Sequence, residues 1–224
     1  MNVLRLTYPG SFLDLFDHAQ CEQAQRLVDL MEAAFTDAMA ALSLFQADTA
    51  RRRTSCAIPP TGEPPVCPSC GNHRIPDYLQ RRLPFVHARV FLYALDTFRK
   101  ALTVLAEIPS VPDVVGRERD AYRSALPSLT PLRNTTQHLE DRARCLGKDG
   151  KPLELKPVIN EMFHFPSGGV LALDILNGNQ YGATTSDGAY SEIEVAMPTL
   201  TTTHRCLQAV INALPWQGRS RQYP

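Results

Sequence analysis

The sequence predicts a mostly α-helical protein, an antiparallel helical bundle with a small three-stranded antiparallel β-meander before the last helix. Apolar residues recur at alternating spacings of four and three over residues 12–49 and again over 85–107, which is the pattern of helices that pack along a common seam. Residues 170–196 instead contain three short runs that suit strands. A chain of 224 residues can bury a substantial core, so we expect one domain, residues 1–224, with insertions.

Composition narrows the classes of partner. Lysine plus arginine equals aspartate plus glutamate at 23 each, so no global field attracts nucleic acid or an anionic membrane. No apolar run is long enough to span a bilayer, and Asp14 and Asp17 interrupt the stretch where a signal peptide would be apolar. We therefore expect a cytoplasmic protein with no membrane partner.

Two long helices are defined by their apolar stripes. The first stripe comprises Ala24, Val28, Met31, Phe35, Ala38, Leu42 and Phe45. The second comprises Phe91, Leu95, Phe98, Leu102 and Leu105. Pro84 is expected to open the second helix, and Pro109 and Pro112 follow its end.

Residues 51–76, between these two helices, form a Pro/Cys-rich insertion with neither helical nor strand period. Cys67 and Cys70 are spaced as Cys-x-x-Cys before a glycine, which resembles a single zinc-ribbon knuckle. Cys56 and His73 would complete a tetrahedral set of ligands for a structural zinc ion. Four protein ligands leave no open position, so a catalytic zinc is not expected. The alternative is a proline-rich loop that holds three cysteines and no metal.

A third helix is expected over residues 112–126 and a fourth over residues 130–146. Thr130 can cap the fourth helix, Pro131 suits its first turn, and Gly147 is the expected left-handed stop. One face of this helix is apolar, with Leu132, Thr136, Leu139, Ala143 and Leu146. The far face carries Asn134, His138, Asp141 and Cys145, with Arg133 between the two faces. Such a helix buries one side and presents polar groups on the other.

The remaining elements are a meander and a closing helix. The expected strands are residues 170–176, 180–184 and 189–196, with Asn177-Gly178 and Asp187-Gly188 as hairpin turns. Residues 168–197 are therefore predicted to be a β-meander insertion. The last helix is expected over residues 198–214, with His204 on its inward face and a loose tail after it.

Arg133-Asn134-x-x-x-His138 resembles the signature of the HEPN superfamily, whose members are helical domains marked by an arginine, a polar residue that is often asparagine, and a histidine. Four residues separate Arg133 from His138, within the four to six that the signature allows. The plan of two long antiparallel helices, a later helix with the motif and a closing helix is also similar. The strands and the cysteine-rich stretch would be insertions in that plan.

The resemblance implies cleavage of RNA without a metal or another cofactor, in a site that the motifs of two protomers of a homodimer form together. Arg133 would hold the scissile phosphate and offset its charge. His138 would move a proton, since an imidazole is the side chain that exchanges protons most readily near neutral pH. Asn134 would orient the imidazole or donate to the phosphate, and Asp141 would fix the imidazole tautomer.

Two other interpretations of the same residues stay open. His138, Asp141 and Arg142 can be a solvated ion-pair face, and Arg133, Asn134 and His138 can be a hydrogen-bonded knot at an interface without turnover. The second function hypothesis is therefore a non-catalytic protein-interaction or regulatory domain with an unidentified protein partner and a zinc-stapled loop.

Overall fold

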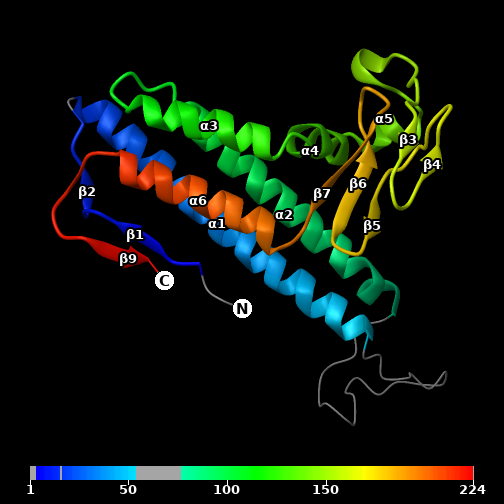
Figure 1. The fold of residues 1–224 in the computed structure, drawn as a ribbon, viewed down its shortest axis with the longest axis horizontal. Coiled ribbons are helices and arrows are strands. Elements are labelled where there is room, and N and C mark those ends of the chain that lie inside the picture. Colours follow the sequence, from blue (N-terminus) through cyan, green and yellow to red (C-terminus); the bar gives the residue numbers. More distant parts are fainter. Residues whose placement is uncertain (1–3, 16, 54–76, 224) are drawn as a thin grey trace, which may run out of the picture.

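The computed structural model describes residues 4–15, 17–53 and 77–223. This part of the chain is mostly helical, with small antiparallel sheets, as the sequence predicts (Figure 1). Its helices are α1 (His18–Arg53), α2 (Asp77–Leu105), α3 (Asp113–Ala125), α4 (Leu129–Gln137), α5 (Leu139–Ala143) and α6 (Met197–Ala213). No helix in these described ranges is both long and apolar enough to cross a membrane.

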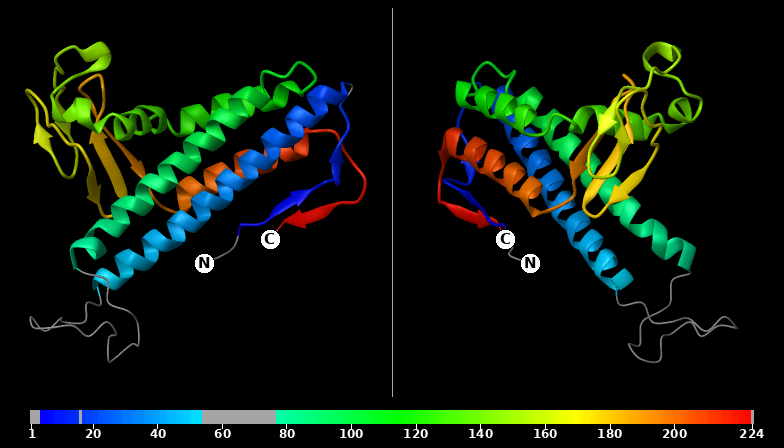
Figure 2. Two further views of the ribbon diagram at one scale, coloured as in Figure 1. Left: turned by 180° about the vertical axis from the view of Figure 1, so that it is seen from behind. Right: turned by 45° about the vertical axis from the view of Figure 1, so that its right-hand side comes forward.

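Four of the helices close into a bundle around one core. α1 packs against α2, α2 against α3, α3 against α6, and α6 against α1. Figure 2 shows α1 and α2 as the long antiparallel pair, with α4 continuing from α3 alongside α2. The largest fully buried side chains are Tyr8, Tyr122, Tyr181, Phe35, Phe45, Phe91, Phe98, Leu6, Met31, Leu42, Leu92 and Leu95. Both predicted apolar stripes are therefore buried.

One predicted boundary of α2 is wrong. The helix begins at Asp77 and contains Pro84, which the sequence predicted to be its opening residue. A proline inside a helix removes one hydrogen bond and crowds the preceding turn. Here the turn before Pro84 is nevertheless helical, and the proline itself is buried. Tertiary packing of the ring thus outweighs its poor helix propensity.

The three-stranded meander is confirmed. β5 (Ile175–Asn177), β6 (Gln180–Thr184) and β7 (Tyr190–Glu194) form one antiparallel sheet in that order. Gly178 and Gly188 have φ angles of 57° and 82°, in the left-handed region that the predicted turns require. The first strand is shorter than expected because its chain pairs with β6 only from Ile175 onward.

The last residues are paired, so the expectation of a loose tail is wrong. β1 (Leu6–Tyr8) pairs with β9 (Arg221–Tyr223), and β2 (Phe12–Leu13) pairs with β8 (Trp216–Gln217). Figure 1 shows this pair of ribbons beside α1 and α6, with β1 and β9 side by side. A further hairpin joins β3 (Val158–Ile159) to β4 (His164–Phe165) before the meander.

His204 is satisfied, as predicted, although its site is at the edge of the core. Its Nε2 lies 2.8 Å from the carbonyl oxygen of Arg5, and its ring contacts that of Phe35 at 5.7 Å. This histidine joins α6 to the segment before β1, which is a structural role.

Candidate functional site

The segment that carries the predicted motif is two helices, and the expectation of one helix over residues 130–146 is wrong. His138 separates α4 from α5 in a non-helical conformation, with φ −130° and ψ 44°. Its amide donates to the carbonyl of Thr135 at 3.1 Å, and the hydroxyl of Thr136 donates to the carbonyl of Arg133 at 2.8 Å. Threonine hydroxyls compete in this way with the helical hydrogen-bond pattern.

The end of α5 also differs from the expected one. Cys145, with φ 57°, is the left-handed residue, whereas Gly147 has φ −87°. The amide of Leu146 donates to the carbonyl of Asp141 at 2.8 Å, which is the six-to-one bond of a Schellman motif. The stop is thus two residues earlier than the glycine, because α5 itself ends at Ala143.

The break changes which side chains are buried. Leu132 and Thr136 of α4 are buried, as the apolar stripe predicts. In α5 the buried side chain is Arg142, which donates to the carbonyl of Leu146, whereas the predicted core residue Ala143 is exposed. The predicted two-face pattern therefore holds only up to His138.

Arg133 extends from α4 to α2, where a buried carboxylate holds it. Its Nε lies 2.8 Å from Oδ2 of Asp96, whose side chain is 3% exposed. Its Nη1 donates to Oδ1 of Asn134 at 2.8 Å. Among the described residues, Nη2 of Arg133 has no hydrogen-bond partner. The two motif residues are therefore in contact, and one edge of the guanidinium is available.

Asp96 is the centre of a group of cations. Arg99 donates to Oδ1 through Nε and Nη2, at 3.0 and 2.9 Å, and Nζ of Lys100 lies 3.0 Å from Oδ2. With Arg133, three cations share this one carboxylate, so the group has an excess of two positive charges. Because the carboxylate is buried and its partners are partly exposed, the ion pairs hold the three cations at the edge of the core.

His138 is exposed, with 58% of its side chain accessible. Its Nδ1 lies 3.7 Å from Oε1 of Glu140, and the ligand atoms of His138, Glu140 and Asp141 all lie within 4.8 Å of one another. Asp141 is therefore near the imidazole, and its role in fixing the tautomer stays a prediction. Glu140, which the sequence pattern did not single out, is beside it too.

A second group of charges joins α2 to the meander. Asp174, just before β5, contacts Nη2 of Arg82 and Nη2 of Arg89, both at 2.6 Å. The Nε of Arg89 donates to the hydroxyl of Tyr181 at 3.3 Å, and burial raises the pKa of that phenol well above its ordinary value. This network fixes the sheet beside α2.

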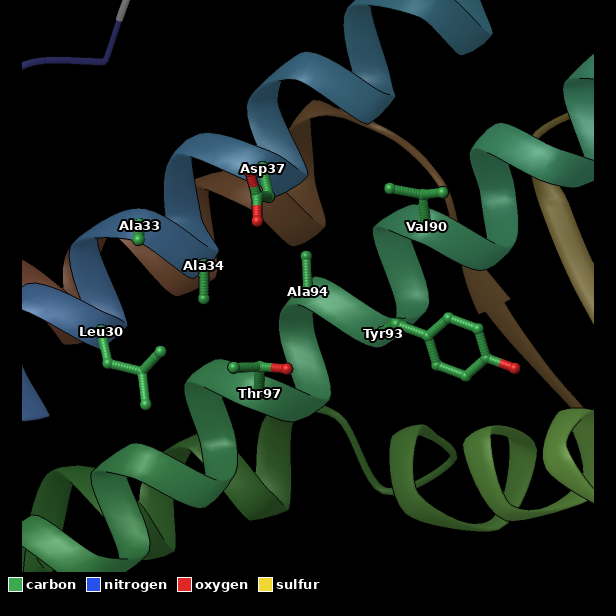
Figure 3. A pocket seen from close by; sticks show the side chains of 8 residues that line it. All are labelled: Leu30, Ala33, Ala34, Asp37, Val90, Tyr93, Ala94 and Thr97. Carbon is green, nitrogen blue, oxygen red and sulfur yellow. The ribbon is translucent and has the colours of Figure 1, made fainter.

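A shallow groove runs between α1 and α2 on the outer side of the pair (Figure 3). Leu30, Ala33, Ala34, Asp37, Val90, Tyr93, Ala94 and Thr97 line about 240 Å³ of it. Asp37 is the one charged side chain among them. The groove is mostly apolar and offers no set of groups for acid–base chemistry.

The predicted zinc ligands Cys56, Cys67, Cys70 and His73 lie outside the described residues. The structural zinc ion therefore stays a prediction from their spacing.

Sequence reasoning missed Asp96, although a signal was present. An aspartate beside Leu95, within the apolar stripe of a long helix, needs a cation, and Arg99 and Lys100 follow at the spacings of a helical turn. What periodicity does not reveal is that Arg133, from another helix, completes the group.

Comparison of the chain with protein-family models, with curated proteins and with solved structures gives no match.

Proposed function

We propose that this protein is a HEPN-like endoribonuclease that cleaves RNA without a metal ion, with Arg133, Asn134 and His138 of two protomers forming one site. The observation that carries the proposal is the fixed position of Arg133. Its ion pair with buried Asp96 and its Nη1 hydrogen bond to Asn134 orient the guanidinium, while His138 lies exposed directly after the same helix. A preorganised guanidinium can stabilise the charge that develops on the phosphate, and an accessible imidazole can transfer the proton.

The proposed chemistry uses the ribose itself. One imidazole accepts the proton of the 2′-hydroxyl as its oxygen attacks the adjacent phosphorus, and the 5′-oxygen leaves with a proton from a second imidazole. The products are a 2′,3′-cyclic phosphate and a 5′-hydroxyl. The guanidinium of Arg133 stabilises the added negative charge on the phosphate oxygens.

The second imidazole is the reason for a dimer. One chain supplies one His138, whereas the reaction needs one base and one acid. A two-fold axis beside α4 and α5 would bring His138 of the partner subunit to the other side of the phosphate. The proposal places this reaction in the cytoplasm, where single-stranded transcripts are present.

His138→Ala tests the proposal directly. We expect purified protein to cleave a fluorescent single-stranded RNA in 5 mM EDTA and the variant to lose at least about a hundredfold in rate, because one proton-transfer group is removed. His18→Ala is the matched control, since His18 is also exposed and lies on α1, away from the motif. Its rate should equal that of the unchanged protein.

Three results would contradict this function. Cleavage that persists in His138→Ala would mean that a contaminating nuclease is responsible. If the unchanged protein does not cleave RNA, the proposed nuclease function is wrong. Cleavage abolished by EDTA would mean a cation site, for which His138, Glu140 and Asp141 are the nearest group of ligands.

A second candidate is a non-catalytic interaction domain, and the α1–α2 groove favours it. Leu30 and Val90 at its walls are 45% and 43% exposed, and the exposed Val86 and Val104 continue the same side of α2. Apolar side chains that gather on one face suit a protein partner. Under this alternative the Arg133–Asp96 pair only joins α4 to α2. The zinc ion predicted in residues 51–76 would stabilise a loop. Metal analysis of the purified protein tests whether zinc is bound.

A further inference from the structure

α2 carries an unusual excess of basic residues for a chain without net charge. It contains Arg81, Arg82, Arg89, Arg99 and Lys100, but its acids are Asp77 and Asp96 alone. α4, which lies beside it, contributes Arg133 and no acid. Together α2 and α4 therefore carry six basic and two acidic side chains, an excess of four positive charges beside the motif.

Four side chains of α2 share one face. Arg82, Arg89, Tyr93 and Lys100 are separated by seven, four and seven residues, which places them within about 40° on a helix of 3.6 residues per turn. At 1.5 Å per residue this face extends for about 27 Å. A linear array of that length suits an extended chain and spans several nucleotides.

Two largely buried carboxylates hold the cations of this face in place. Asp174, whose side chain is 11% exposed, holds Arg82 and Arg89, while Asp96 holds Lys100 together with Arg99 and Arg133. Five cations share two largely buried acids, which leaves three positive charges in excess. Arg82 and Lys100 remain half exposed, so their charge reaches solvent.

Tyr93 lies between the two cation groups. Figure 3 shows its ring projecting from α2 on the side away from α1. The side chain is half-buried and also lines the edge of the groove between α1 and α2. An aromatic ring between phosphate-binding cations is the arrangement on which unpaired bases stack.

We infer that the face formed by Arg82, Arg89, Tyr93 and Lys100 binds single-stranded RNA and leads it to Arg133 and His138. The inference rests on the proposed function for the identity of the nucleic acid. The half-exposed Arg82 and Lys100 contact phosphates, Arg89 stays paired with Asp174 and Tyr181, and Tyr93 stacks on a base. A duplex, whose bases are already stacked, cannot use Tyr93 and binds more weakly. The face reads no 2′-hydroxyl, so single-stranded DNA of the same length competes within a few-fold.

Binding is tested in the His138→Ala background, so that the RNA stays intact. The probe is a fluorescein-labelled 12-nucleotide single-stranded RNA, followed by fluorescence anisotropy. We expect Arg82→Gln/Lys100→Gln to weaken binding about tenfold or more at low salt and to lower the slope of log affinity against log salt by about 0.7 for each phosphate that is no longer neutralised. Tyr93→Leu should weaken binding at least about fivefold and leave that salt slope unchanged.

The matched control is Arg26→Gln, which removes an exposed arginine from α1 instead. It should change affinity less than twofold. Far-UV circular dichroism and thermal melting show whether each variant is folded, and the conservative pair Arg82→Lys and Tyr93→Phe should restore binding where Gln and Leu do not.

The outcome is separable from that of the nuclease proposal. If the α2 variants bind as tightly as the control, the proposed RNA-binding face of α2 is wrong, even if the unchanged protein cleaves RNA through His138. If the α2 variants bind RNA more weakly but the unchanged protein cleaves none, the RNA-binding face is supported and the nuclease proposal is overturned. The single-strand face is also overturned if a duplex binds as tightly as the single strand and Tyr93→Leu has no effect on binding.

Discussion

At the scale of single residues, Asp96 determines how the motif is presented. A carboxylate that is almost fully buried is costly unless cations and hydrogen bonds compensate it, and Arg99, Lys100 and Arg133 provide both. The compensation is more than complete, so the excess charge lies at the surface beside Asn134. A structural requirement of the core thus places an excess of positive charge at the surface.

Another aspartate shows how a charged pair couples stability to pH. Nζ of Lys156 lies 2.7 Å from Oδ2 of Asp187, and the hydroxyl of Thr185 donates to Oδ1 at 2.6 Å. These bonds, that from Lys156 first, lower the pKa of Asp187 to about 2. The group titrates at about 3.8 when its partners are absent. It therefore stabilises the fold above that value, and the contribution disappears as the pH falls from about 4 towards 2.

We accordingly predict that Asp187→Asn has its full destabilising effect near pH 6 and progressively less below pH 4. Urea unfolding of both proteins, followed by circular dichroism between pH 2.5 and 7, measures the difference. A difference that is constant over this range would mean that the carboxylate keeps an ordinary pKa. Asp120→Asn should show a smaller effect of the same sign, since the bond from its neighbour Arg119 also lowers the pKa of Asp120, but by less.

At the scale of elements, the short α5 and its left-handed end distinguish the observed structure from the predicted one. Periodicity identified α1, α2, α3 and α6 because each turns apolar residues at helical spacing towards the core. It could not identify the break at His138, since Thr135 and Thr136 fit a helix as well as the local hydrogen bonds that end it. The hairpin glycines Gly178 and Gly188 were predictable because few other residues adopt positive φ.

The same limit applies to the candidate site. Arg133, Asn134 and His138 can be selected from the sequence by residue type and spacing, and their chemistry follows. Asp96 is 37 positions earlier, and only the packing of α2 on α4 brings it to Arg133. Contacts between distant segments leave no periodic trace, which is also why the pairing of β1 with β9 was missed.

The left-handed residue at the end of α5 gives a stability prediction. Cys145 is exposed with φ 57°, a conformation that costs a non-glycine residue about 1 kcal/mol. Cys145→Gly should therefore raise the free energy of unfolding by up to about 1 kcal/mol, net of the greater entropy of glycine in the unfolded chain. Chemical denaturation measures it.

Ala143→Gly is the control for that substitution. Ala143 is exposed and helical, so glycine there should lower the free energy of unfolding by about 0.5–1 kcal/mol. If both glycines destabilise equally, residue 145 does not hold a left-handed conformation in solution.

At the scale of the whole molecule, zero net charge conceals a separation of charge. α1 carries five acids, Glu22, Asp29, Glu32, Asp37 and Asp48, against Arg26 over residues 18–50, and Arg51, Arg52 and Arg53 end the helix. α2 and α4 carry the opposite excess. A composition balanced at 23 charges of each sign therefore does not count against a local surface for a polyanion.

The pairing of the two ends of the chain gives the last prediction. Trp216 packs edge-on against Tyr8 with ring centroids 5.0 Å apart, and its Nε1 donates to the carbonyl of Ile211 at 2.7 Å. Tyr8 is fully buried, so the tail covers part of the main core. Truncation after Leu214 removes Trp216 and the partners of β1 and β2. We expect it to lower the free energy of unfolding by about 3 kcal/mol, near the lower end for loss of a packed aromatic side chain.

Truncation after Gly218 separates the two contributions. It keeps Trp216 and β8 but removes β9, which contributes ladder hydrogen bonds to β1 and the Arg221 guanidinium over the Tyr8 ring, so the loss should be less than half as large. Urea unfolding followed by far-UV circular dichroism compares the three chains, and in the two that keep it the single tryptophan gives a second, local signal. Since Trp216 packs on the bundle core, its fluorescence and the helical signal should change together. A fluorescence change at lower urea, or equal stability of all three chains, would mean that the tail forms no part of the cooperative unit and that the bundle is closed without it.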